Sequence, residues 1–188
     1  MKRLFLAIPI NIKSSLASDL ANTLRRQLGH EKFINWVRLD NVHLTLKFIG
    51  NTFPYDEPKI IDAVTEMIQS HKAFDMVFDN VGIFGSHYAP RVIWLGMKNT
   101  PQQLLSLADD VLDTFDKIGF PRDRQNFVPH LTLARIKKLY DKEYFTKIIA
   151  AVEQKPYISQ NVNEVILFQS ILRTEGPIYK IEKSWHLT

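Results

Sequence analysis

The tetrapeptide HLTL occurs twice in this chain, at His43–Leu46 and again at His130–Leu133. The two copies are 87 residues apart (130 − 43 = 87), which is close to half of the 188 residues. Each copy lies in a run rich in Val, Ile, Leu and Phe, a composition typical of β-strands. A repeat at half the chain length indicates a duplicated module and therefore two similar lobes.

The order of the expected elements supports this duplication. Strand, helix, HLTL strand, helix and strand follow one another before about residue 85, and the same order returns from about residue 91. The predicted strands are Arg3–Ile8, His43–Ile49, Phe74–Phe84, Arg91–Met97, Val128–Ile136, Val162–Leu172 and Ile178–Trp185. We therefore expect one domain, residues 1–188, made of two pseudo-symmetric lobes that each supply one HxT motif.

Helical patterns occupy most of the gaps between these strands. They are "IKSSLASDLANTLRRQLG", "EPKIIDAVTEMIQSH", "PQQLLSLADDVLDTFDKIG" and, more weakly, Asp141–Val152. A short connection holding Gly85 and Pro90 joins two of the strands, as in a hairpin, so the sheet is not expected to be all parallel. The sequence predicts an α+β fold with mixed or antiparallel sheets and helices packed outside.

The chemistry of the repeat follows from strand alternation. Alternate side chains of a strand share a face, so His43 lies beside Thr45 and His130 beside Thr132. Imidazole exchanges a proton near neutral pH, and a Thr hydroxyl is a donor that cannot repel an anion. Two such pairs that face each other suit displacement at a phosphodiester, since one His activates water and the other protonates the leaving oxygen. The alternative is that HLTL is only a good strand sequence with a structural His.

The residues around the two motifs carry a family resemblance. The flanking stretches are "WVRLDNVHLTLKFIG" and "NFVPHLTLARI", and the chain also contains "RLFLAI", "RVIWLG" and "LFQSILRTEGPIYKIEKSWHL". With these, nearly the whole chain resembles the 2H phosphoesterase superfamily. Within it, the chain is most similar to the bacterial and archaeal RNA 2′,3′-cyclic phosphodiesterases once named 2′-5′ RNA ligases.

This resemblance implies a bilobal, pseudo-two-fold fold with the motifs facing each other across a central cleft. It implies hydrolysis of an RNA 2′,3′-cyclic phosphate to a 2′-phosphate without metal or cofactor, and the reverse 2′-5′ ligation at the same site. Carried onto this chain, His43 is the proton donor to the leaving 3′ oxygen and His130 the proton acceptor from water. Thr45 and Thr132 hold the non-bridging oxygens, and Arg135 matches an Arg that the family places five residues after the second His.

Alternation raises a question about two further basic residues. Strict alternation puts Arg135 on the face opposite His130, so it reaches a phosphate only if the strand bends or the side chain wraps round. The same argument puts Lys47 on the face of His43 and Thr45, where it would approach the phosphate. Four more basic residues flank the second motif and line a groove for an RNA backbone or are simply solvated: Arg122, Arg124, Lys137 and Lys138.

Composition limits the class of protein. The chain has no Cys, which excludes disulfides, thiolate catalysis and Cys-based zinc sites. The net charge of +4 is a mild excess that fits an anionic substrate. No apolar stretch approaches the ~18 residues of a membrane span, and the apolar start reads as a first buried strand. We expect a cytoplasmic monomer that does not bind membranes and acts on RNA with a 2′,3′-cyclic phosphate end or on a small cyclic nucleotide.

Other functions remain open at this point. The same site would serve a phosphodiesterase for 2′-5′ oligonucleotides or small cyclic nucleotides, because loops rather than strands set specificity. A non-catalytic module that binds RNA ends is a second alternative. A metallohydrolase is a third, but neither motif has the His and carboxylate cluster that a metal needs.

Overall fold

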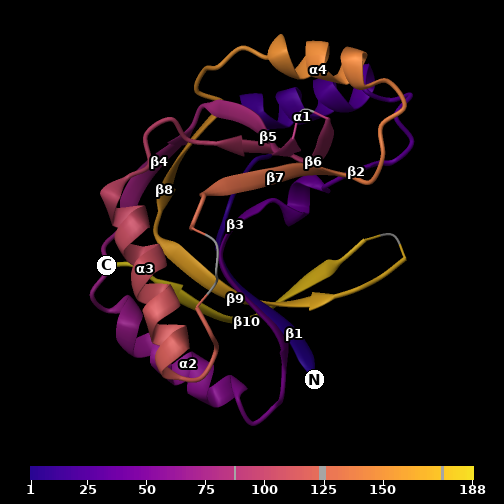
Figure 1. Ribbon diagram of the computed structural model, residues 1–188. Coiled ribbons are helices and arrows are strands. Elements are labelled where there is room, and N and C mark those ends of the chain that lie inside the picture. The colour runs from indigo at the N-terminus through magenta and orange to yellow at the C-terminus, as the bar shows by residue number, and fades with distance from the viewer. Residues whose placement is uncertain (87, 123–125, 175) are drawn as a thin grey trace.

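The chain forms an α+β domain, as expected, with helices on the outside of a long antiparallel sheet (Figure 1). The computed structural model describes residues 1–86, 88–122, 126–174 and 176–188. Its helices are α1 (Leu16–Gln27), α2 (Glu57–Ile68), α3 (Gln102–Lys117) and α4 (Lys142–Ala150), with a 3-10 turn η1 (Leu39–Asn41). Among the described residues, no helix is long and apolar enough to cross a membrane.

The main sheet has the strand order β10-β9-β1-β3-β7-β6-β5, and the short strand β2 also pairs with β7. A second sheet consists of β4 and β8. All of the pairs are antiparallel. The strands are β1 (Lys2–Pro9), β2 (Ile34–Trp36), β3 (His43–Thr52), β4 (Phe74–Phe78), β5 (Asn80–Ser86), β6 (Ala89–Gly96), β7 (His130–Ile136), β8 (Ile158–Val162), β9 (Glu164–Ile171) and β10 (Ile178–His186).

The two strands that carry HLTL are neighbours at the centre of this sheet. They pair only through Leu44 of β3 and Leu131 of β7. Beyond this pair β3 continues along β1, whereas β7 continues between β6 and β2. The sheet therefore divides here, and in Figure 1 β7 runs above the hairpin of β9 and β10.

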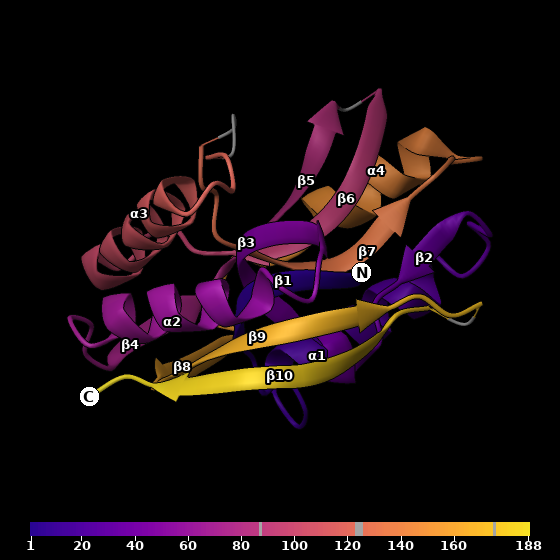
Figure 2. The same ribbon diagram turned by 90° about the horizontal axis from the view of Figure 1, so that it is seen from below.

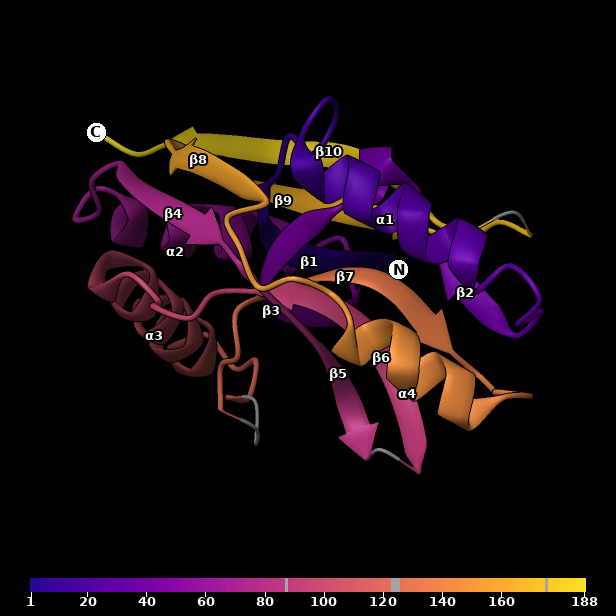
Figure 3. The same ribbon diagram turned by 90° about the horizontal axis from the view of Figure 1, so that it is seen from above.

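Helices cover the outer faces of both parts of the sheet. Helix α1 begins at Ser15, whose hydroxyl accepts a hydrogen bond from the backbone of Ser18, and it buries Leu20 and Leu24 at the four-residue spacing of one face. Figures 1 and 3 show α1 and α4 over the β7 part, and Figures 2 and 3 show α2 and α3 side by side near β3. In the part of the chain that the structure describes, no helix covers the opposite face of β3 and β7.

The structure corrects two of the expected strands. The run Phe74–Phe84 breaks at Asp79, so that β4 pairs with β8 while β5 pairs with β6. The run Val162–Leu172 corresponds to β9, and its first residue is the end of β8, which was not expected and stops before Asn163. The expectation of continuous strands was wrong because hydrophobic composition does not reveal where a strand leaves one sheet for another.

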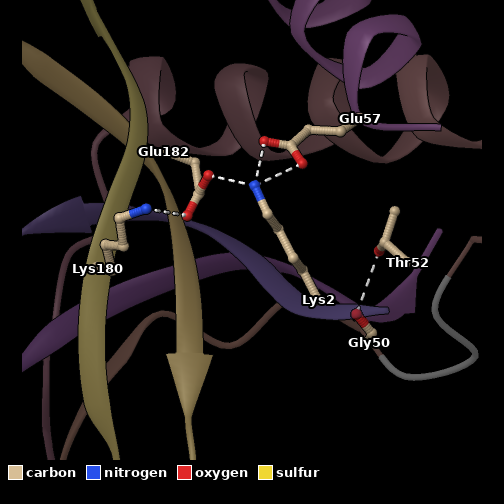
Figure 4. A network of polar contacts seen from close by, with 6 residues as sticks. All are labelled: Lys2, Gly50, Thr52, Glu57, Lys180 and Glu182. Carbon is tan, nitrogen blue, oxygen red and sulfur yellow. Dashed lines mark hydrogen bonds and ion pairs between the residues drawn. The ribbon is translucent and has the colours of Figure 1, made fainter. Parts of the chain in front are cut away.

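A network of charged side chains joins the start of β1 to α2 and β10 (Figure 4). Nζ of Lys2 lies 2.8 Å from Glu57 Oε2 and 2.5 Å from Glu182 Oε2, and Lys180 Nζ lies 3.5 Å from Glu182 Oε1. Hydrogen bonds to Glu182 and Glu57 raise the pKa of Lys2. The network holds the first strand and the last strand to the same helix.

Candidate active site

The register of β3 and β7 brings the two HxT motifs together. Leu44 pairs with Leu131, and both side chains are buried in the core. The residues on either side of this pair point to the opposite face of the sheet. They are His43 and Thr45 on β3 and His130 and Thr132 on β7, and all four are half-buried. This antiparallel register puts His43 across from Thr132 and Thr45 across from His130.

His43 is held by its own turn and by aromatic rings. Its Nδ1 lies 2.7 Å from the carbonyl oxygen of Asn41, and Asn41 Nδ2 donates to the carbonyl of Pro177 at 2.8 Å. Because a carbonyl only accepts, Nδ1 carries the proton, and Nε2 of the neutral ring keeps a lone pair. The rings of Phe5 and Tyr179 lie at centroid distances of 4.8 and 5.2 Å from the imidazole.

His130 repeats this arrangement on the other strand. Its Nδ1 lies 2.7 Å from the carbonyl oxygen of Val128, so the same tautomer is fixed and Nε2 is again available. The ring of Phe84 meets the imidazole edge to face, with centroids 4.7 Å apart and planes at 88°. Two imidazoles with the same orientation relative to their strands thus present equivalent nitrogens on one face of the sheet.

The pKa of both histidines is lowered. Burial is the main cause, and the positive charge of Arg135 lowers both further. His130 also lowers the pKa of His43, while the hydrogen bonds to Asn41 and Val128 act in the opposite direction. Among the residues that the structure describes, no carboxylate contributes to either shift. Both rings are therefore neutral in the free protein at pH 7, with the positive charge of Arg135 acting on each of them.

A β-bulge decides the position of Arg135. Trp94 of β6 lies opposite Thr132. Val92, two residues earlier and on the same face of β6, lies opposite Arg135, so Leu133 is the extra residue of the bulge. The bulge moves Arg135 onto the face of Thr132 and His130, where strict alternation had not placed it. Its guanidinium makes no ion pair with any residue that the structure describes.

The corresponding bulge in β3 removes Lys47 from the site. Ala7 lies opposite Thr45 and Leu6 opposite Lys47, which leaves Leu46 as the extra residue. Lys47 therefore points to the core, is 3% exposed and donates a hydrogen bond to the carbonyl of Pro121 at 2.7 Å. The alternation argument that placed Lys47 beside His43 was wrong. Phe48, which is 55% exposed, takes that face instead.

The two Thr hydroxyls and the two Nε2 atoms complete a site suited to an anion. Neither Thr45 nor Thr132 makes a side-chain hydrogen bond to a described residue. A tetrahedral anion between the strands would meet two neutral hydroxyl donors, a guanidinium and two imidazoles. In the described part of the chain, no group of three or more His, Cys, Asp or Glu side chains has an arrangement that could hold a metal ion.

The aromatic walls of the site were not found by sequence reasoning. Phe5, Phe84 and Tyr179 contact the two imidazoles from β1, β5 and β10. Trp94 lies beside Thr132, and its ring occupies the space that a Cβ at Gly82 would need, since the nearest ring atom is 2.4 Å away. No local motif marks these residues, because sheet pairing across long sequence separations brings them to the site.

The matches to known proteins agree with this geometry. Residues 12–171 match the model of the 2′-5′ RNA ligase superfamily. The chain belongs to this family. It is 30% identical over 97% of its length to an RNA 2′,3′-cyclic phosphodiesterase of Methanocaldococcus jannaschii, of which 99% is covered. It is 33% identical over 84% of its length to one of Aeropyrum pernix, of which 89% is covered.

Solved structures show the same fold. Escherichia coli LigT in complex with 3′-AMP superposes with a TM-score of 0.71 at 24% identity, covering 100% of this chain and 98% of LigT. TT0787 of Thermus thermophilus gives a TM-score of 0.75 at 20% identity, covering 98% and 97%. The fold predicted from the family resemblance is therefore confirmed.

Proposed function

We propose that this chain hydrolyses the 2′,3′-cyclic phosphate at an RNA 3′ end to a 2′-phosphate. The observation that carries the proposal is the pair of imidazoles on one face, each with Nδ1 bound to a carbonyl and Nε2 available, next to Arg135. The curated relatives named RNA 2′,3′-cyclic phosphodiesterase support the substrate class.

The reaction needs one proton taken and one proton given. Water attacks phosphorus and loses its proton to Nε2 of neutral His130, while the bond from phosphorus to the 3′ oxygen breaks. That oxygen receives the proton of Nε2 of protonated His43. Water replaces the 3′ oxygen on phosphorus, so charge and atoms balance and no further reactant is needed. The two rings then exchange protons with solvent to restore the starting state.

The negative charge of the substrate prepares His43 for this role. In the free protein burial and the charges of Arg135 and His130 keep the pKa of His43 low. A bound phosphodiester brings a negative charge between these groups, which favours the protonated ring. Arg135 and the hydroxyls of Thr45 and Thr132 then bind the non-bridging oxygens, where charge grows in the transition state.

The strand arrangement also supports a division of the domain into two lobes. On one side β3 lies next to β1, and on the other β7 lies next to β6, with the break at Asp79 matched by the break at Asn163. We propose that residues 1–188 form a single domain of two pseudo-symmetric lobes, each of which supplies one HxT motif. Because one chain supplies both histidines, we also propose that the monomer is active.

The test is an assay of adenosine 2′,3′-cyclic phosphate in excess EDTA, with the product identified by chromatography. We expect 2′-AMP from the wild type, formed roughly 10²–10⁴-fold more slowly by the variants His43→Ala and His130→Ala. Loss of activity in EDTA that returns with added metal would show a metallohydrolase instead. Tight binding without turnover would show a module that only holds RNA ends. A 2′-5′ linked dinucleotide, tested in parallel, shows whether linear linkages are also substrates.

A further inference from the structure

Tyr179 of β10 lies on the face of the sheet that carries the two histidines. Strand pairing shows this step by step, because residues directly opposite each other share a face. Phe48 of β3, which lies on that face, is opposite Phe5 of β1. Phe5 is opposite Phe168 of β9, and Phe168 is opposite Ile181 of β10. Tyr179 precedes Ile181 by two residues in regular register, so the last hairpin brings a phenol to the candidate active site.

The ring of Tyr179 packs directly against the ring of His43. Their centroids are 5.2 Å apart and their planes stand at 86°, so the two rings meet edge to face. Phe5 meets Tyr179 in a similar way, at 4.9 Å and 71°, and the centroid of Phe168 lies 6.2 Å away. These contacts fix the direction of the phenol before a ligand arrives, so binding a ligand does not have to order this side chain.

A chain of hydrogen bonds also ties β10 to the first motif. Nδ1 of His43 donates to the carbonyl of Asn41 at 2.7 Å, and Asn41 Nδ2 donates to the carbonyl of Pro177 at 2.8 Å. Pro177 precedes Tyr179 by two residues. The position of Tyr179 relative to His43 is therefore set twice, once through the rings and once through the backbone.

The hydroxyl of Tyr179 makes no hydrogen bond with a residue that the structure describes. The side chain is half-buried, but its oxygen is not enclosed by the protein, so a ligand can reach it. Burial raises the pKa of Tyr179, while the charges of Arg135 and Arg3 act in the opposite direction. The phenol is therefore neutral at pH 7 and keeps a proton that it can donate.

Two arginines act on this hydroxyl from different strands. Arg135 of β7 is the residue whose charge also lowers the pKa of both histidines. Arg3 of β1 is two residues before Phe5 and shares its face. Guanidinium groups only donate, so neither arginine supplies an acceptor for the phenol. An anion bound beside Arg135 would supply the acceptor that Tyr179 lacks.

The basic residues that flank the second motif lie elsewhere. Arg122 forms ion pairs with two carboxylates of α3. Arg124 lies outside the described residues. Lys137 and Lys138 line a cavity of about 540 Å³ beside the start of α4, on the side of the sheet that this helix covers. The positive charge that acts on Tyr179 therefore comes from the two arginines of β7 and β1.

We propose that Tyr179 contacts the substrate, with its hydroxyl donating a hydrogen bond to a non-bridging oxygen of the phosphodiester held between the histidines. This inference rests on the proposed function and adds a donor from β10 to those of Thr45, Thr132 and Arg135. The bond strengthens as negative charge grows on that oxygen in the transition state. A neutral donor does so without lowering the pKa of His43 further, as another cation would.

The test removes the hydroxyl and keeps the ring. Tyr179→Phe preserves the ring contacts with His43 and Phe5. The matched control is Tyr144→Phe, because the hydroxyl of Tyr144 donates to the carbonyl of Gln27 at 3.3 Å, in a contact of α4. The substrates are adenosine 2′,3′-cyclic phosphate and its two phosphorothioate diastereomers, in each of which sulfur replaces one non-bridging oxygen. The measurement is kcat/KM for each protein on each substrate, with chemical denaturation to compare the stability of the variants.

We expect Tyr179→Phe to lower kcat/KM for the oxygen substrate by roughly ten- to a hundredfold, the effect of losing one hydrogen bond to a charged group. Tyr144→Phe should leave it unchanged. Sulfur is a weak acceptor, so the diastereomer whose sulfur faces Tyr179 should be slow in the wild type. In Tyr179→Phe this slowing should largely disappear, while the other diastereomer should keep its own.

Three results would overturn the inference: no loss in Tyr179→Phe, an equal loss in Tyr144→Phe, or a loss by the same factor on all three substrates. The last would show that Tyr179 only supports the ring of His43. If the wild type hydrolyses none of the three, the proposed function is wrong, and the affinity for inorganic phosphate, measured by calorimetry, decides the contact instead. Weaker binding in Tyr179→Phe alone supports the contact, and unchanged binding refutes it.

Discussion

The strands β3 and β7 begin with the same four residues but continue differently. In each, the fourth residue of HLTL is a bulge, at Leu46 and at Leu133. The next residue returns to the core, and the one after it lies on the face of the histidine. In β3 that position holds Phe48, and in β7 it holds Arg135. The same β-bulge therefore presents an aromatic ring in β3 and a positive charge in β7.

The surroundings of the two histidines also differ between the two strands. The carbonyl that holds His43 belongs to Asn41, which is tied to Pro177, and two aromatic rings cover the imidazole. The carbonyl that holds His130 belongs to Val128, which is 51% exposed. A proton acceptor must meet water, and a proton donor works best where water is excluded. This difference between the neighbours of the two motifs supports the proposed division of roles, with His43 as proton donor and His130 as proton acceptor.

The largest expected effects separate the two histidines. The variants His43→Ala and His130→Ala should each lower kcat by roughly 10²–10⁴-fold on a cyclic nucleotide, the usual worth of a positioned proton carrier. The double variant should lose much less than the product, because both residues serve one step. On a p-nitrophenyl ester, whose leaving group needs no proton, only His130→Ala should remain severe. The opposite pattern in steady-state kinetics would exchange the two roles.

A smaller effect on kcat should distinguish Arg135 from Phe48, the residues that lie two positions after the bulges. Arg135→Ala should lower kcat by roughly 10²–10³-fold, as expected for a donor aimed at developing charge, and weaken binding of the 2′-phosphate product less. Phe48→Ala removes no charge, so it should leave kcat near that of the wild type. Equal losses of kcat in the two variants would show that the difference between the strands has no catalytic meaning.

The pH dependence tests whether the charge of Arg135 lowers the pKa of both histidines. Since both pKa values are lowered, kcat/KM should follow a bell centred below the ordinary histidine pKa of about 6.5. The charge of Arg135 is one cause of both shifts, so Arg135→Ala should move both pKa values upward. Titration of the two imidazoles by NMR reads this directly, without activity. A shift in only one histidine would mean that Arg135 serves a single strand.

The smallest effect on catalysis should come from the position just after the bulge. Lys47 is buried and donates to Pro121, so Lys47→Met should lower the free energy of unfolding by about 1–3 kcal/mol. The value of kcat should stay near that of the wild type, because Lys47 faces away from His43. Chemical denaturation with Lys72→Met as an exposed control checks this. A large loss of kcat at unchanged stability would show that Lys47 contacts the phosphate after all.

Sequence alone located the centre of the candidate site but not its borders. Alternation holds over the three residues from His43 to Thr45 and from His130 to Thr132, so these four were placed on one face correctly. It fails at Lys47 and for Arg135, because a bulge depends on pairing with a neighbouring strand.

The same limit applies to the walls and to the sheets. Tyr179 and Phe84 reach the histidines through long-range strand pairing, which has no local pattern. The break at Asp79 has a similar cause, since its backbone donates to the carbonyl of Gly96 and its side chain accepts from Lys98. These contacts bridge strands and loops that a reading of one segment cannot connect.

The position of β1 between β3 and β9 has a consequence for protein synthesis. During translation β1 and β3 emerge before β9 and β10, which bring Phe168 and Tyr179 to the ring cluster around His43. Until then the free edge of β1 is open to wrong partners, and long-range pairing of this kind is slow. A nascent chain therefore cannot complete the His43 pocket before β9 and β10 are made, and chaperones that shield strand edges should favour its maturation.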